Sequence, residues 1–92
     1  IDFMKKISEG AIVIDVRTPE EYSRGHIANS VNIPLDILEK SLDLLNDKEK
    51  TIITCCASGM RSEKAKKILK KLEYSQVYNG GGWSSLNKKI NK

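Results

Sequence analysis

The residues best suited to chemistry lie in one stretch, Thr51-Ile-Ile-Thr-Cys-Cys-Ala-Ser-Gly-Met-Arg-Ser62. A β-branched, apolar run ends at two cysteines, and a loop of small residues with Gly59 at its centre follows. A segment with helical periodicity then begins. A thiol at the end of a strand, facing a helix N-terminus across a tight loop, is well placed to ionise. The stretch therefore predicts a reactive cysteine.

We assign that role to Cys56, because the loop after it offers three ways to stabilise a thiolate. Successive backbone N–H groups can form an anion-binding nest. The N-terminus of the next helix adds partial positive charge, and Arg61 adds a full charge with a planar fork for an anion. The thiolate is the nucleophilic form of cysteine. The predicted binding residues are Ala57, Ser58, Gly59, Met60, Arg61 and Ser62.

Cys55 is interpreted as a small hydrophobic residue, because strand alternation points it away from Cys56. The alternative is a resolving thiol that closes a strained disulfide with its neighbour. Two adjacent cysteines and one distant histidine, His26, fall short of a closed zinc site. No metal site is predicted.

Two further polar residues, Asp15 and Arg17, are predicted to support the site. Asp15 at the end of a strand is expected to accept backbone N–H bonds that fix the neighbouring loops, in preference to acting as a catalytic acid. Arg17 is expected to pair with Asp15, Glu20 or Glu21. His26, between Gly25 and Ile27, is interpreted as a hydrogen-bonded turn residue and not as a base.

Strands alternating with helices predict an α/β domain with a largely parallel sheet. Continuous apolar runs such as Ala11–Val16 indicate strands buried on both faces. In such sheets the active site lies at the carboxyl ends of the strands. Strands are predicted at 11–16, 30–33, 51–55 and 76–78, helices at 1–10, 19–24, 35–45, 63–72 and 83–89, and an irregular glycine turn at 79–82.

Size and charge limit the classes of protein that remain. A single domain is expected over residues 1–92, either a whole protein or a domain of a longer chain. No apolar run approaches the ~20 residues that span a bilayer, and no leader pattern is present, so a cytoplasmic protein without a membrane partner is expected. A monomer is expected as a separate prediction. The net charge of +4 comes mostly from lysines at 64–71 and 88–92 without interleaved aromatics, which argues against a nucleic-acid partner.

Four segments together resemble the single-domain rhodanese (thiosulfate sulfurtransferase) family. The loop from Cys56 to Ser62 is similar to its active-site loop. Three more segments occur in the family's order: 14–17 with 20–22, 25–27 with 31–34, and 81–83. The resemblance covers nearly the whole chain. It implies a three-layer fold with about 4–5 mostly parallel strands flanked by helices.

By this resemblance, Cys56 would take a sulfane sulfur from thiosulfate or a similar small anion and carry it as a persulfide. Cyanide, a small thiol or a protein cysteine would then accept the sulfur. Arg61 would anchor the oxyanion of the donor, and no metal or organic cofactor would be required. Such a reaction is ping-pong covalent catalysis.

Two other functions stay open on the same loop: phosphatase or arsenate-reductase chemistry, and a non-catalytic sulfur carrier or interaction module. Related phosphatases place five residues between cysteine and arginine, whereas this loop has four, which favours sulfur over phosphate. The chain also departs from the family. Met60 stands where polar residues are common and predicts an apolar rim, and Glu73 stands where glycine often ends the long helix, which predicts a different helix cap.

Overall fold

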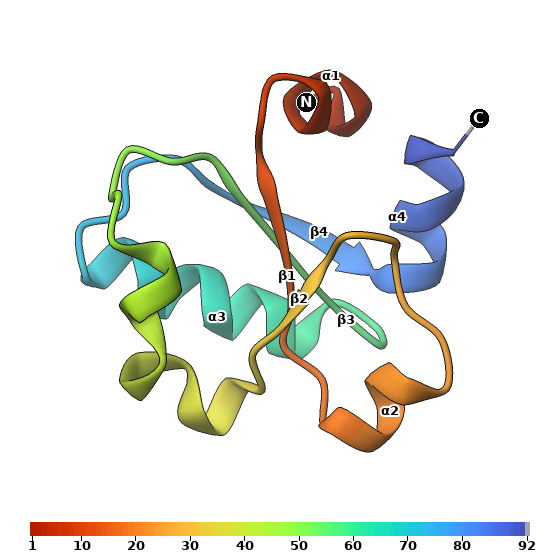
Figure 1. Cartoon of the computed structure of the whole chain (residues 1–92), viewed down its shortest axis with the longest axis horizontal. Coiled ribbons are helices and arrows are strands. Elements are labelled where there is room, and N and C mark those ends of the chain that lie inside the picture. The colour runs from red at the N-terminus through yellow and green to blue at the C-terminus, as the bar shows by residue number, and fades with distance from the viewer. Residues whose placement is uncertain (92) are drawn as a thin grey trace.

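A computed structural model describes residues 1–91, apart from the side chain of Leu44. Four parallel strands form the central sheet in the order β2-β1-β3-β4 (Figure 1). The strands are β1 (Ile12–Asp15), β2 (Val31–Asn32), β3 (Ile52–Cys56) and β4 (Val77–Gly82). Because all four run in the same direction, their carboxyl ends meet at one edge. The predicted α/β architecture is confirmed.

Helices cover both faces of the sheet, which gives the three expected layers (Figure 1). One face carries α1 (Phe3–Ser8) and α4 (Trp83–Ile90), which pack on each other. The other carries α3 (Met60–Lys71) and two 3₁₀-helices, η1 (Leu35–Lys40) and η2 (Leu42–Leu45). The short helix α2 (Pro19–Ser23) lies near the carboxyl edge, and within residues 1–91 no helix has the length and apolar character to cross a membrane.

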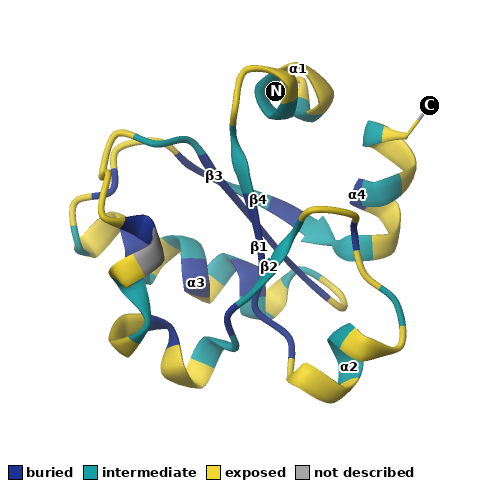
Figure 2. Cartoon of the chain, viewed as in Figure 1, coloured by how far each residue is buried: buried dark blue, intermediate teal, exposed yellow. Residues whose placement is uncertain are grey.

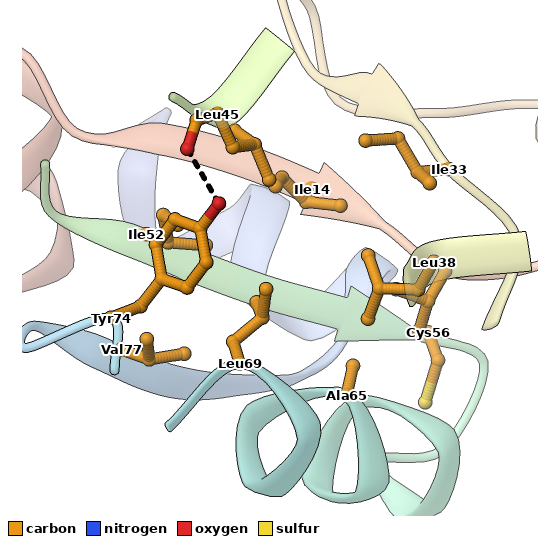
Figure 3. Close-up of a cluster of buried hydrophobic side chains, with 11 residues drawn as sticks. Ile14, Ile33, Leu38, Leu45, Ile52, Cys56, Ala65, Leu69, Tyr74 and Val77 are labelled. Atoms are coloured by element: carbon orange, nitrogen blue, oxygen red, sulfur yellow. Dashed lines mark hydrogen bonds between the residues drawn. The ribbon is translucent and has the colours of Figure 1, made fainter. Parts of the chain in front are cut away.

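Two hydrophobic cores fill the spaces between these layers, and Figure 2 shows the central strands as the most buried part of the chain. The core beneath α3 includes Ile14, Ile33, Leu38, Leu45, Ile52, Cys56, Ala65, Leu69, Tyr74 and Val77 (Figure 3). The core beneath α1 and α4 includes Val13, Ile27, Ile53, Cys55 and Leu86. Strand alternation explains the division, since successive residues of β3 point to opposite faces. Cys55 and Cys56 therefore belong to different cores, as predicted.

The helix α2 begins at a capping box. The Thr18 hydroxyl accepts the Glu21 N–H at 3.2 Å, and the Glu21 carboxylate accepts the Thr18 N–H at 3.0 Å. Pro19 fits the first turn because its missing N–H would have no partner there. This reciprocal pair fixes where α2 starts and holds the Glu21 carboxylate at the carboxyl edge of the sheet.

The prediction of one helix over 35–45 is wrong. The segment forms the two 3₁₀-helices η1 and η2, and Ser41 between them has φ −121° and ψ 33°. Leu35 and Leu38, then Leu42 and Leu45, are each three residues apart, which places each pair on one side of a 3₁₀-helix. The leucine spacing therefore identified the buried side of the segment but not its helix type.

The predicted turn at 79–82 is also wrong, because these residues are the last four of the six residues of β4. Thr54 pairs with Asn79 and Cys56 with Gly82, so β4 has one more residue than β3 over this interval. Such a bulge needs a special backbone conformation, which Gly81 supplies with φ 80°. The chain needs a left-handed glycine here, as expected, but within a strand.

The cap of α3 differs from the prediction at Glu73. Glu73 adopts φ 73°, the left-handed conformation in which glycine is favoured. Its N–H donates to the Lys70 carbonyl and the Tyr74 N–H to the Leu69 carbonyl, each at 3.0 Å. These two bonds form a Schellman motif. The helix therefore ends with the backbone of a glycine cap although a glutamate occupies the position.

Candidate active site

The predicted loop connects β3 directly to α3 at the carboxyl edge of the sheet. Cys56 is the last residue of β3, and Gly59 caps the N-terminus of α3 with φ 102°. Ala57 and Ser58 are exposed, and Met60 is 73 % exposed. Cys56 itself is only 1 % exposed, so the surrounding residues cover its sulfur almost completely.

Hydrogen-bonding groups of the loop and of α3 contact the Cys56 sulfur. The Gly59 N–H donates to Sγ across 2.9 Å, and the Ser62 hydroxyl lies 3.4 Å from Sγ. Figure 3 shows the sulfur on the side of β3 that faces α3. Both contacts come from the loop and the first turn of that helix, where backbone N–H groups lack intrahelical partners. The sulfur thus occupies a site suited to an anion.

These contacts determine the direction of the Cys56 pKa. Burial raises the pKa of the thiol, because it penalises the thiolate. The Ser62 hydroxyl and the backbone N–H groups of Ser62, Gly59 and Ser58 oppose burial by stabilising the thiolate, and the pKa of Cys56 lies below its ordinary value. The loop therefore favours the nucleophilic form of the sulfur.

The end of β4 supports the loop from behind. A Cβ on Gly82 would lie 2.8 Å from the Ala57 carbonyl oxygen, closer than real Cβ contacts allow. A Cβ on Gly59 would lie 3.5 Å from the Gly81 Cα. The two segments are therefore neighbours, as the sheet topology predicted, and glycine at 82 lets the loop backbone approach β4.

Asn79 hydrogen-bonds to both of these segments, a role that was not predicted for it. Its Oδ1 accepts the Ser62 hydroxyl at 2.6 Å and the Gly81 N–H at 2.8 Å. Its Nδ2 donates to Glu63 Oε1 at 3.1 Å and to the Gly59 carbonyl at 3.3 Å. The only available signal was its position just before the glycines of a strand end. One amide thus connects β4 with the loop and the first turn of α3.

Asp15 and Arg17 form a buried ion pair beside the loop. The Arg17 Nη2 lies 2.7 Å from Asp15 Oδ2, and the side chains are 5 % and 0 % exposed. Asp15 also accepts the Arg17 N–H at 3.0 Å, so its predicted use of a backbone N–H bond is found. Arg17 further donates to the Gly25 carbonyl at 2.7 Å and stacks 4.8 Å over the Trp83 ring. The pair thus connects β1 with two other parts of the fold, the residues that follow α2 and the helix α4.

Arg61 is placed in the first turn of α3, with its side chain turned toward α2. Its Nη1 lies 2.7 Å from Glu21 Oε1, and its Nη2 lies 2.9 Å from Glu21 Oε2. The hydrogen bond from Arg61 is the main reason that the pKa of Glu21 is lowered to about 2. This ion pair was not predicted, because the two residues are 40 positions apart and meet only when β1 and β3 pair.

The remaining candidates have no contact with the sulfur. Burial, the charge of Asp15 and the neighbouring Cys56 raise the pKa of Cys55 to about 12 against a smaller opposing effect of Arg17, so Cys55 stays a neutral thiol. His26 Nδ1 lies 2.8 Å from the Tyr22 carbonyl oxygen and its ring stacks on Tyr22, as expected for a turn residue. Among residues 1–91 no His, Cys, Asp and Glu side chains group as metal ligands would.

The structure therefore brings together Cys56, the loop to Ser62, Asp15 and Arg17 at one edge of the sheet. Their roles as nucleophile, binding groups and support stay predictions. Glu21 and Asn79 join them as residues that sequence reasoning did not assign to the site. What the arrangement can do chemically is hold a sulfur anion at the base of a short ring of backbone N–H groups.

Comparisons with known proteins agree on one family. A family model described as "Rhodanese-like domain" matches residues 2–89. Thiosulfate sulfurtransferase PspE of Escherichia coli is 40% identical over 70 residues, which cover 75% of this chain and 67% of PspE. Putative sulfur carrier protein YrkF of Bacillus subtilis is 39% identical over 79 residues, but these cover only 42% of YrkF. A solved structure, "rhodanese with anions from E. coli", superposes with a TM-score of 0.76 at 37% identity, covering 82% of this chain and 89% of that one.

Proposed function

This chain belongs to the rhodanese-like domain family, and from that premise we propose that it transfers a sulfane sulfur from thiosulfate or a similar donor through a persulfide on Cys56. The observation that carries the proposal is the Gly59 N–H, which points at the Cys56 sulfur across 2.9 Å. A preorganised donor of this kind stabilises negative charge on the sulfur without reorganising during the reaction.

The proposed first step is an attack of the Cys56 thiolate on the outer sulfur of thiosulfate. A sulfur–sulfur bond forms on Cys56, the sulfur–sulfur bond of thiosulfate breaks, and sulfite leaves with the bonding electron pair. The product is a persulfide anion on Cys56. The loop N–H groups that stabilise the thiolate then stabilise the terminal sulfur, which is anionic as well. Arg61 lies at the rim of the site, where its guanidinium contacts the Glu21 carboxylate.

In the second step a thiophilic acceptor attacks the terminal sulfur, and the Cys56 thiolate is regenerated as the leaving group. Cyanide, a small thiol or the cysteine of a partner protein can act in this way. Neither step requires a metal ion or an organic cofactor. The exposed, apolar Met60 beside the ring favours a thiol or protein acceptor over a small ion.

A sulfur-carrier role is the second candidate, since one relative is named a putative sulfur carrier. It uses the same persulfide but no repeated turnover. Phosphatase or arsenate-reductase chemistry is less well supported, because four residues, not five, separate Cys56 from Arg61. A carboxylate close to the ring, Glu21, is bound to Arg61 in a charged pair and is not placed as a proton donor.

Intact mass spectrometry tests the proposal. After incubation with thiosulfate, the protein should gain the mass of one sulfur atom and lose it again on addition of cyanide. Cys56→Ser should show no gain, whereas the matched variant Cys55→Ala should keep it. Multiple turnovers of thiocyanate per chain support a transferase, and a single turnover supports a carrier. A gain of sulfur in Cys56→Ser, or hydrolysis of an aryl phosphate, would overturn the proposal.

A further inference from the structure

Arg61 is the cation of the loop itself, but the Glu21 carboxylate already balances its charge. Both terminal nitrogens of its guanidinium contact Glu21, at 2.7 and 2.9 Å. The two side chains are 34 % and 33 % exposed, so the pair lies at the surface of the site where a donor would arrive. A planar guanidinium that binds one carboxylate through both terminal nitrogens has few N–H groups left for a second anion.

Glu21 is held in place independently of Arg61. Its Oε1 accepts the Thr18 N–H at 3.0 Å as part of the capping box of α2, and the Thr18 hydroxyl lies 3.2 Å away. Arg17 Nη1 approaches the Glu21 carbonyl at 3.3 Å. If an incoming anion binds Arg61, the Glu21 carboxylate therefore stays where it is and loses its main partner. Its negative charge then lies close to the bound anion.

The second arginine near the loop offers no compensation. Arg17 is 4 % exposed and is bound to the Asp15 carboxylate. Within residues 1–91, both guanidinium groups beside the loop thus face a carboxylate. The anionic sulfur donor is then attracted mainly by the ring of N–H groups and the N-terminus of α3, which together carry only partial positive charge.

We propose that Glu21 is a specificity-determining residue that, by holding Arg61, favours sulfur donors with one negative charge over doubly charged thiosulfate. This inference rests on the proposed function of Cys56. Glu21 acts in two ways: it competes with the donor for Arg61, and its carboxylate repels the second charge of the donor. Both effects grow with the charge of the donor, because Coulomb energy is proportional to charge.

Methanethiosulfonate is a matched probe for this inference, because a methyl group replaces one charged oxygen of thiosulfate. In both reactions the Cys56 thiolate bonds to the outer sulfur and the donor's sulfur–sulfur bond breaks. Sulfite leaves from thiosulfate and methanesulfinate leaves from methanethiosulfonate, each with the bonding electron pair. The two donors thus deliver the same persulfide and differ mainly in charge.

The test compares the KM of the two donors in Glu21→Gln. Glutamine keeps the side-chain oxygen that accepts the Thr18 N–H, so the capping box is preserved. The KM of thiosulfate should fall about 1.5- to fivefold, the range expected when one partly exposed ion pair is removed. The KM of methanethiosulfonate should change less, and kcat with a common acceptor should change little for either donor.

One control variant tests the overall negative charge of α2, and a second tests the contact between Glu21 and Arg61. Glu20→Gln removes the same charge from the exposed neighbour in the same turn of α2 and should leave the KM ratio of the donors unchanged. In an Arg61→Gln background, Glu21→Gln should lower the ratio of the thiosulfate KM to the methanethiosulfonate KM by a clearly smaller factor than it does when Arg61 is present. An equal change for both donors, or the same shift in Glu20→Gln, would overturn the inference. A wild-type protein that gains no sulfur from either donor would instead contradict the proposed function.

Discussion

The Ser62 hydroxyl has one proton and three possible acceptors. Asn79 Oδ1 lies 2.6 Å away, the Gly59 carbonyl 3.0 Å and the Cys56 sulfur 3.4 Å. While Cys56 is a thiol, the proton of Ser62 can remain with Asn79. Once Cys56 ionises, the sulfur becomes the stronger acceptor, because hydrogen bonds to charged groups are about twice as strong. The reactivity of Cys56 thus depends on a neutral hydroxyl as well as on the loop N–H groups.

Ser62→Ala should therefore raise the pKa of Cys56, since it removes a hydrogen bond that stabilises the thiolate. The pH dependence of alkylation by iodoacetamide measures this pKa, and the rate at pH 7 should fall accordingly. Ser58→Ala is the matched control, because Ser58 acts on Cys56 through its backbone N–H, which alanine keeps. An unchanged alkylation profile in Ser62→Ala would show that the hydroxyl does not assist ionisation.

At the residue scale, sequence reasoning selected Cys56 because local features decide it: the strand end, the small loop and the helix start all lie within twelve residues. It could not select the Glu21–Arg61 pair, which depends on how α2 and α3 are placed at the sheet edge. The capping box offered a complete explanation of Glu21 by itself. A carboxylate that satisfies a local motif can still have a second partner across the fold.

Among the elements, α3 ends under backbone strain. Glu73 occupies the left-handed conformation of a Schellman motif, where a side chain costs roughly 1–2 kcal/mol relative to the right-handed one. The motif forms nonetheless, because Tyr74 and Leu69 are both buried in the same core. Packing of the residues on either side therefore imposes the backbone conformation on Glu73.

Glu73→Gly should stabilise the protein by about 1 kcal/mol, because glycine adopts a left-handed conformation without this cost. Urea unfolding measures the change in the free energy of unfolding. Glu73→Ala is the control: it removes the same charge but keeps the Cβ, so it should give little of the gain. If glycine and alanine have equal effects, charge and not backbone strain determines the stability at this position.

The order and type of most elements followed from hydrophobic spacing, as the continuous apolar run Ala11–Val16 illustrates for β1. The exceptions have physical causes that one sequence does not reveal. The leucines at 35–45 have a spacing that both helix types accommodate, and the break at Ser41 arises from packing. Glycines at 79–82 indicate a special backbone conformation, but a bulged strand and a turn need the same residues.

For the molecule as a whole, β3 carries two adjacent cysteines into two different cores. Cys55 is 0 % exposed and belongs to the core beneath α1 and α4. Its pKa is raised to about 12, mainly by burial, from the 9.0 expected for an unfolded chain. A group with a raised pKa contributes stability below its unfolded pKa, and this contribution is lost as the pH rises toward the folded pKa.

The native state should therefore lose stability between pH 9 and pH 12 by about 1.4 kcal/mol per pH unit on account of Cys55. Urea unfolding measures the free energy of unfolding of the wild type and of Cys55→Ala across this range. The difference between these two free energies should become smaller as the pH rises. Val13→Ala, in the same core but without a titratable group, should keep a constant difference from the wild type. Parallel curves for all three proteins would contradict the prediction.

The opposite orientation of the two cysteines also bears on oxidative damage. Peroxides convert a reactive thiolate to a sulfenic acid, which many proteins rescue by condensing it with a nearby second thiol. Here the only other sulfhydryl of these 92 residues is on the far side of β3. Oxidised Cys56 must then wait for a thiol from solution before further peroxide drives it to the irreversible sulfinic acid. The reducing capacity of the surroundings thus sets how long the site survives.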